Sequence, residues 1–553
     1  MPSTLISIAT LLTALLPGAE PTAPWNDSIC QRDMKADLFF LAGDRFRGRL
    51  TATHENELAS EFIASRFDRL GLKRIGPDDS YYHRFNLTTA SLGQPNTLEV
   101  TENIFRAVKL GFHHGSDFIP LNFSPTATAY GQIVFAGFGI SAAEKGHDDY
   151  QDLNVRGKIV LVLEHEPGET DPKSPFDGVI MSEASTQLRK ALVADAHRAA
   201  GILFVSDVHN HPGPENFEAL AHSAWPEQPP RIPRYLLHNW ADRVHIPSAQ
   251  ISTAVARTLL HEAGAKDSLE DLARAAEKPS GGKIEIGRVQ VELKTHVRRH
   301  VVPDRNVLAA LEGSDPKLKD EWVVISCHHD HNGADDDQVF NGADDNGSGV
   351  VGLLEIAEAY ALAAQDRHRP KRSILFVSFN SEERGLLGSW AFVERPPVPL
   401  DRIVAVLNMD MVGRDEEIPE GGGPRFRGLP AQSAKSNHNA VNLLGYSRSG
   451  SLAQVIDQAN APFGLTIKKV LDNNASQLLR RSDQWPFLQR GVPAMFFHTG
   501  LHPDYHTPGD RPERINYPKM ERIVRLVHQA SWDLSQQPGR PRLDAKAPAT
   551  TNR

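Results

Sequence analysis

The sequence predicts an α/β protein in which helices flank both faces of a mostly parallel, mixed central sheet, with a β-rich module inserted into it. From about residue 300 to 534, apolar runs such as WVVIS and IVAVLNM alternate with segments of helical periodicity. From about 111 to 295 the chain instead consists mainly of short strand-like runs and turns. A length of 553 residues exceeds what one hydrophobic core usually organises, so two or three domains are expected.

The first element is an apolar stretch, LISIATLLTALLPGA, at residues 5–19. It is too short to span a bilayer, and small residues such as Ala19 and Ala23 follow the pattern of a cleavage point. We interpret residues 1–23 as a signal peptide, which predicts a secreted or periplasmic protein. The segment MPSTL before it carries no Lys or Arg, so a disordered or buried N-terminal segment is the alternative.

The next elements divide the chain into a main domain and an insertion. Residues 24–110 form the first part of the main domain, and apolar residues at helical spacing predict a helix over 54–71. Residues 111–295 form the insertion, with strands in AYGQIVFAGFG, VRGKIVLVLEH and GILFVSD and a helix in LRKALVADAHRAA. The main domain continues over 296–535, with helices expected at 348–364 and near 483–490. Residues 536–553 are expected to be a disordered tail.

Composition excludes some classes of protein. Hydrophobic residues make up 40% and charged residues 23% of the chain, as in soluble globular proteins, and no membrane span is expected. A net charge of −9 argues against a nucleic-acid partner, because phosphate neutralisation needs a basic surface. The two cysteines, Cys30 and Cys327, lie in very different contexts, and we expect no disulfide between them.

Polar side chains cluster where the predicted strands of the main domain end. Because carboxyl ends of strands converge on a crevice in α/β proteins, these residues are candidates for a site. They are His328 and Asp330 after WVVIS, Glu382 and Glu383 after RSILFVSF, Asp410 after IVAVLNM, His506 after VPAMFFH, and Asp344 and Asp345 in the loop NGADDNGSG.

Each candidate has an ordinary structural explanation taken alone. A single His at a strand end is usually structural, Asp-Gly runs are usually surface turns, and a Glu pair often opens a helix. Asp410 is harder to explain in this way, because a carboxylate ending a very apolar strand needs a cation or several donors. Imidazoles and carboxylates without thiolate suit zinc, and also manganese or cobalt.

Six strings in this order resemble the co-catalytic zinc aminopeptidases, a family that also includes glutamate carboxypeptidase and the transferrin receptor. The strings are SCHHDHNG, NGADDNGSG, NSEERGLLGS, LNMDMVG, SDQWPFLQRGVPAMFFHTG and DYHTPGD, between residues 326 and 510. Residues 41–72 resemble the family's N-terminal helix, and VRGKIVLV and AAGILFVSD resemble a protease-associated domain. The resemblance implies the zinc exopeptidase fold.

The resemblance also implies roles for individual residues, for two Zn²⁺ ions per chain and for a cis peptide bond after Asp345. Glu382 becomes the general base, Asp330 the partner of His328, and Tyr505 a group that stabilises the oxyanion. The implied metal ligands are His328 and Asp410 on one ion, Glu383 and His506 on the other, and Asp345 as the bridge.

The function expected from this resemblance is hydrolysis of N-terminal residues from peptide substrates by an aminopeptidase. A glutamate-carboxypeptidase-like carboxypeptidase or dipeptidase is the alternative, and it would need an arginine to bind a terminal carboxylate. Candidate arginines are Arg414, Arg425, Arg480 and Arg481. A third reading is a non-catalytic binding protein on the same scaffold. Where many relatives have Ser-Asp-His, this chain has Ser482, Asp483 and Gln484, which puts a substrate contact by that His in doubt. The sequence does not indicate an oligomeric state.

Overall fold

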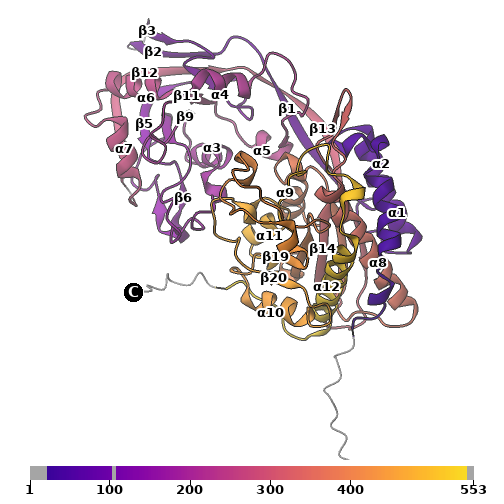
Figure 1. The fold of residues 1–553 in the computed structure, drawn as a ribbon. Coiled ribbons are helices and arrows are strands. Elements are labelled where there is room, and N and C mark those ends of the chain that lie inside the picture. Colours follow the sequence, from indigo (N-terminus) through magenta and orange to yellow (C-terminus); the bar gives the residue numbers. More distant parts are fainter. Residues whose placement is uncertain (1–21, 103–106, 280, 545–553) are drawn as a thin grey trace, which may run out of the picture.

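The computed structural model of the protein describes residues 22–102, 107–279 and 281–544. The predicted signal peptide therefore falls almost entirely outside the described residues. Two large sheets organise the chain, one of nine strands and one of eight (Figure 1).

The nine-stranded sheet is the centre of the main domain. Its middle strands β17, β14, β18 and β21 are parallel, whereas the strands toward both edges pair mainly in the antiparallel sense, so the sheet is mixed as expected. In their order across the sheet the strands are β10 (Leu236–Leu237), β1 (Tyr82–Leu92), β13 (Val297–Leu311), β17 (Ser373–Phe379), β14 (Trp322–His328), β18 (Ile403–Met409), β21 (Ala494–His498), β19 (Ala440–Leu444) and β20 (Thr466–Lys468).

Helices cover both faces of this sheet, because its central strands are apolar on both sides. In β14, Val323 and Ile325 lie in one buried core and Val324 lies in the other. The helices of the first core are α1 (Gln31–Leu41), α2 (His54–Arg69), α8 (Gly349–Gln365), α10 (Gly450–Ala459) and α12 (Tyr517–Gln536). The helices of the second core are α3 (Gln187–Ala196), α5 (His238–Asp242), α9 (Leu387–Glu394) and α11 (Gln484–Gln489). The helices predicted at 54–71, 348–364 and 483–490 correspond to α2, α8 and α11.

Helix α8 is the apolar centre of the first core. Within the described residues, one helical stretch, Ala343–Gln365, is long and apolar enough to cross a membrane by composition alone. Of its most apolar window, 83% is buried inside the protein. Its hydrophobicity is therefore explained by packing between the sheet and the neighbouring helices.

The eight-stranded sheet forms a second module, which lies to the upper left in Figure 1. Helices α6 (Thr253–Ala263) and α7 (Leu269–Ala276) pack in its own core. Its strands, in order, are β3 (Ala107–Phe112), β2 (Thr97–Glu102), β12 (Lys283–Thr295), β5 (Ala127–Ala136), β8 (Ile159–Leu163), β9 (Gly201–Val205), β11 (Ser248–Ile251) and β4 (Phe118–Pro120). The sheet begins before residue 111, the boundary expected from the sequence, because β2 pairs with the distant β12. The identification of this module as a protease-associated domain stays a prediction.

The C-terminal segment differs from the expected disordered tail in the part that the structure describes. Helix α12 extends to Gln536, and the buried Arg372 donates to the carbonyl groups of Gln537 and Pro538. Further along, the backbone N–H of Asp544 donates to the carbonyl of Arg448. Residues 537–544 thus lie along the domain surface, held by polar contacts that local composition does not reveal. Residues 545–553 lie outside the described residues.

Candidate metal centre

The predicted polar side chains come from the carboxyl ends of the central strands. Strand β14 ends at His328, and Asp410 directly follows β18. The other members are Glu382 and Glu383 in a 3-10 turn after β17, His506 in the loop after β21, and Asp345 in the turn Ala343–Ser348 that leads into α8. Because β17, β14, β18 and β21 are parallel, their carboxyl ends meet at one edge, and the structure brings all these side chains together.

One group of three ligand-type atoms consists of His328 Nε2 and two carboxylate oxygens. This nitrogen lies 3.3 Å from Asp345 Oδ1 and 3.5 Å from Asp410 Oδ1. Ligand atoms about 2.0–2.1 Å from a tetrahedral zinc lie roughly 3.3 Å from one another, so the spacing suits such an ion. Nε2 of His328 and Oδ1 of Asp410 are buried and have no hydrogen-bond partner among the described residues. Atoms left in this way are expected of ligands that face a cation.

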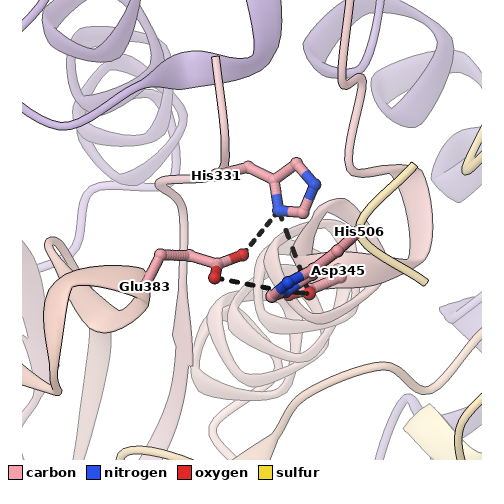
Figure 2. Close-up of side chains that lie close together, drawn as sticks. All are labelled: His331, Asp345, Glu383 and His506. Atoms are coloured by element: carbon pink, nitrogen blue, oxygen red, sulfur yellow. Dashed lines mark ion pairs between the residues drawn. The ribbon is translucent and has the colours of Figure 1, made fainter. Parts of the chain in front are cut away.

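A second group shares Asp345 with the first. His506 Nε2 lies 2.9 Å from Asp345 Oδ2 and 3.2 Å from Glu383 Oε2. Asp345 therefore offers Oδ1 to one group and Oδ2 to the other, as a bridging carboxylate does. Figure 2 shows a fourth side chain here, His331, whose Nδ1 lies 2.7 Å from Glu383 Oε1 and 3.9 Å from Asp345 Oδ2. Sequence reasoning missed His331, although it stands three residues after His328 in the same string.

Strong electrostatic coupling links these groups. Burial alone raises the pKa of Asp345, but its close contacts with the imidazoles of His328 and His506 outweigh burial and bring the pKa well below the ordinary value. Burial lowers the pKa of His506, yet Glu383 and Asp345 raise it to about 10. The pKa of Glu382 is well above the ordinary value, first because of burial and then because of nearby Asp410 and Glu383, with His328 opposing. This concentration of carboxylates favours positive charge in the site, which a divalent cation would supply.

Asp330 holds the two glutamates as well as facing His328. Its Oδ1 lies 3.6 Å from His328 Nδ1 and accepts the backbone N–H of Glu382 at 3.0 Å. Its Oδ2 accepts the backbone N–H of Glu383 at 3.3 Å and the hydroxyl of Thr51 at 3.2 Å. Asp330 is thus a positioning residue for both the strand end and the turn that carries Glu382.

The loop NGADDNGSG separates the roles of its two aspartates. The Asp344 carboxylate points away from the clusters, because its Oδ1 accepts the N–H of Gly413 at 2.7 Å and its Oδ2 lies 3.2 Å from His502 Nε2. The Asp510 carboxylate accepts the backbone N–H groups of both Asp344 and Asp345. The bond between Asp345 and Asn346 is cis, as the resemblance implied.

The segment Ser482–Gln484 contacts the site through Asp410. Ser482 Oγ donates to Asp410 Oδ2 at 2.6 Å, which leaves Asp410 Oδ1 for the first group. Gln484, at the position where the resemblance implies a His, is buried and donates to the carbonyl of Leu479 at 2.6 Å. Gln484 therefore has a packing role here.

A small cavity opens onto the clusters. Tyr505 lines it and stacks on the His506 ring, with 3.8 Å between ring centroids, so the predicted oxyanion group lies beside a predicted ligand. Other residues that line the cavity are Asp345, Glu382, Glu383, Asp410, Met411, Leu478, Arg481, Phe496, His498, Leu501 and His506.

His498 lines the cavity but was not among the residues predicted from the sequence. Its Nδ1 lies 3.1 Å from the carbonyl of Asp410, and its Nε2 has no hydrogen-bond partner among the described residues.

Comparisons with known proteins found a matching family model, related sequences and similar solved structures. Residues 306–531 match the model of peptidase family M28. A probable glutamate carboxypeptidase, AMP1, of Arabidopsis thaliana is 28% identical over 272 residues, which are 48% of this chain and 34% of that protein. A probable zinc metalloprotease of Pyrenophora tritici-repentis is 27% identical over 291 residues, 46% of this chain and 58% of that protein. The chain thus spans between a third and three fifths of these relatives.

Among solved structures, an aminopeptidase from Aneurinibacillus sp. strain AM-1 is similar with a TM-score of 0.47 and 16% identity, covering 94% of this chain and 97% of that one. The matched range 306–531 contains every residue of the two groups described above. The part of the chain that carries both groups is therefore similar to peptidase family M28.

Proposed function

We propose that this chain is a zinc-dependent exopeptidase with two ions per chain, and that it acts as an aminopeptidase on peptides. The observation that carries the proposal is the pair of ligand groups that share Asp345 at one buried strand edge. His328, Asp345 and Asp410 would hold one ion, and Asp345, Glu383 and His506 the other. Manganese or cobalt suits the same ligands.

Zinc bound in these groups would polarise the scissile carbonyl and lower the pKa of an attacking water. The protein's own contribution is to move and place protons. Glu382 Oε2 lies 3.9 Å from His328 Nε2, and its ligand atom is close to those of His328 and Asp410. We assign it the role of general base, which would accept the water's proton and give it to the leaving amine. Tyr505, beside His506, would donate its hydroxyl hydrogen bond to the developing oxyanion.

The end of the peptide that is attacked depends on the charges around the cavity. The lining carboxylates Glu382, Glu383 and Asp410 suit a free terminal ammonium, which supports the aminopeptidase. Arg481 supports the alternative, a carboxypeptidase, since it also lines the cavity. The other candidate arginines are not among the residues that line the cavity. Arg414 pairs with Asp504, Arg425 donates to the carbonyl of Tyr505, and Arg480 donates to the carbonyl of Met181.

A mixed pool of peptides tests in one experiment whether residues are removed from N-termini or from C-termini. We expect the purified protein to remove residues from N-termini, and a chelator to stop this, as followed by mass spectrometry. We expect Arg481→Met to change kcat/KM for these substrates by less than about threefold, whereas loss of a carboxylate clamp costs about 10–100-fold. Loss of residues only from C-termini, together with the larger Arg481→Met effect, would replace the aminopeptidase by the carboxypeptidase. Peptide binding without any hydrolysis would support a non-catalytic protein instead.

The contact between His331 and Glu383 predicts that His331 supports the second ion. Its imidazole occupies Oε1 of Glu383 while Oε2 faces His506, so removal would free the carboxylate to turn. We expect His331→Ala to lower zinc affinity at this position by about 10–100-fold, the usual effect of losing a partner of a ligand. His331→Gln, which keeps an N–H donor, should lose less. The zinc content of both variants after dialysis against increasing concentrations of chelator measures their zinc affinity. Equal zinc retention by wild type and His331→Ala would contradict this role.

Export to the periplasm or the exterior remains part of the proposal, because the apolar leader that suggests it lies outside the described residues. Sequencing the N-terminus of the mature protein would test it.

A further inference from the structure

A further cluster of residue types that can bind metals lies in the module of the eight-stranded sheet, and it shares no residue with the two groups of the candidate metal centre. His165 lies just after β8, Glu169 lies in the following turn, and His211 lies in the loop after β9. Strands β8 and β9 are parallel neighbours, so the loops that follow them leave the sheet at the same edge. This adjacency brings residues more than forty positions apart in the sequence together.

Glu169 stands between the two imidazoles. Its Oε2 lies 3.1 Å from His165 Nδ1 and its Oε1 lies 2.5 Å from His211 Nε2. The two imidazole ring centroids are 4.4 Å apart. The carboxylate is 9% exposed, whereas the side chains of His165 and His211 are 31% and 50% exposed. The cluster is therefore open to solvent through its histidines, and an ion could enter it.

The two loops are fixed to each other beside this cluster. The Glu277 carboxylate accepts the backbone N–H of Gly168 from one loop at 2.8 Å and Nδ2 of Asn210 from the other at 2.6 Å. The buried Lys190 ammonium donates to the carbonyl of His165 at 2.5 Å. His165 itself has φ 64°, a left-handed conformation that residues with a side chain rarely adopt. The backbone just before Glu169 and the Asn210 side chain next to His211 are thus held by contacts that do not involve the imidazoles.

We propose that His165, Glu169 and His211 form a binding site for a transition-metal ion of the zinc type in this module. Two imidazoles and one carboxylate, with one position open to water, are a common donor set for Zn²⁺ and a poor one for Ca²⁺ or Mg²⁺, which prefer oxygen. Both histidines would bind as neutral imidazoles through the nitrogens that face Glu169. The ion would join the loops after β8 and β9 and take no part in peptide hydrolysis.

The full-length chain provides the test, by zinc content. Wild type and variants are saturated with Zn²⁺ and dialysed into metal-free buffer, and zinc per chain is then measured by mass spectrometry. We expect His165→Gln and His211→Gln each to hold one equivalent less than wild type, whatever number the peptidase site holds. Glutamine keeps an N–H donor for Glu169, so a cluster held only by hydrogen bonds would tolerate both changes. Peptide hydrolysis should be unchanged in both variants.

His209→Gln is the matched control, because His209 lies in the same loop as His211 and is not part of the group. It should keep the wild-type zinc content. If either histidine variant folds poorly, Glu169→Gln replaces it, with the same expected loss of one equivalent. Equal zinc content in wild type and the three cluster variants, or an equal loss in His209→Gln, would overturn the proposal and leave the proposed peptidase function untouched.

Discussion

Replacement of Glu382 by Gln is expected to lower kcat by about 10²–10⁴-fold while the zinc content stays at the wild-type level. The side chain is buried beside the first ligand group, with Oε2 3.9 Å from His328 Nε2, and its backbone is held by Asp330. Glutamine has nearly the same shape, so the ligands should keep their places. It cannot accept a proton, however, and the step that needs a base should slow. Steady-state rates and zinc analysis on the same preparation measure both quantities.

Two further variants distinguish a loss of proton transfer from a nonspecific effect of substitution on the structure. Glu382→Asp keeps a carboxylate but withdraws it by one methylene, so its rate should lie between those of wild type and Glu382→Gln. Glu420→Gln changes an exposed glutamate and should have no effect. A Glu382→Gln protein with the wild-type rate would refute the assigned role, and one that has lost zinc would make Glu382 a ligand instead.

The parts of the site that sequence predicts best are those set by the direction of the strands. Apolar runs ending in His328 or at Asp410 predicted strands, and parallel neighbours necessarily gather such ends at one edge. For the same reason the general position of Glu382 and Glu383 followed from the sequence. These predictions needed only periodicity and the rule that buried carboxylates require a partner.

The parts that sequence could not predict depend on side-chain direction or on distant pairing. Asp344 turns toward Gly413, whereas Asp345 faces the two ligand groups. This difference follows from the path of the loop that carries both residues. The contact of His331 with Glu383 joins residues from two different strands' loops. The buried Arg49 is similar, since its guanidinium donates to the carbonyl groups of His329 and Gly342 and so connects the N-terminal segment to the site.

Removal of the shared carboxylate is the second change with a large expected effect. Asp345→Ala takes away Oδ1 from the group of His328 and Oδ2 from the group of His506. Loss of a mere partner of a ligand already costs about 10–100-fold in metal affinity, so loss of a ligand common to both groups should cost more at each. We expect both ions to be lost on dialysis and turnover to fall to the level of the chelated enzyme.

The neighbouring aspartate makes this test specific, because Asp344 has the same charge and burial but faces the other way. Asp344→Asn keeps an oxygen that can accept the N–H of Gly413, so the loop should keep its path and the protein its zinc. Zinc analysis and circular dichroism of both variants compare metal loss with folding. If Asp345→Ala retained two equivalents of zinc, or if Asp344→Asn lost them while folded, the two groups would not share a bridge. The proposal of two ions that share one carboxylate would then have to be given up, because it depends on Oδ1 and Oδ2 of Asp345 facing different groups.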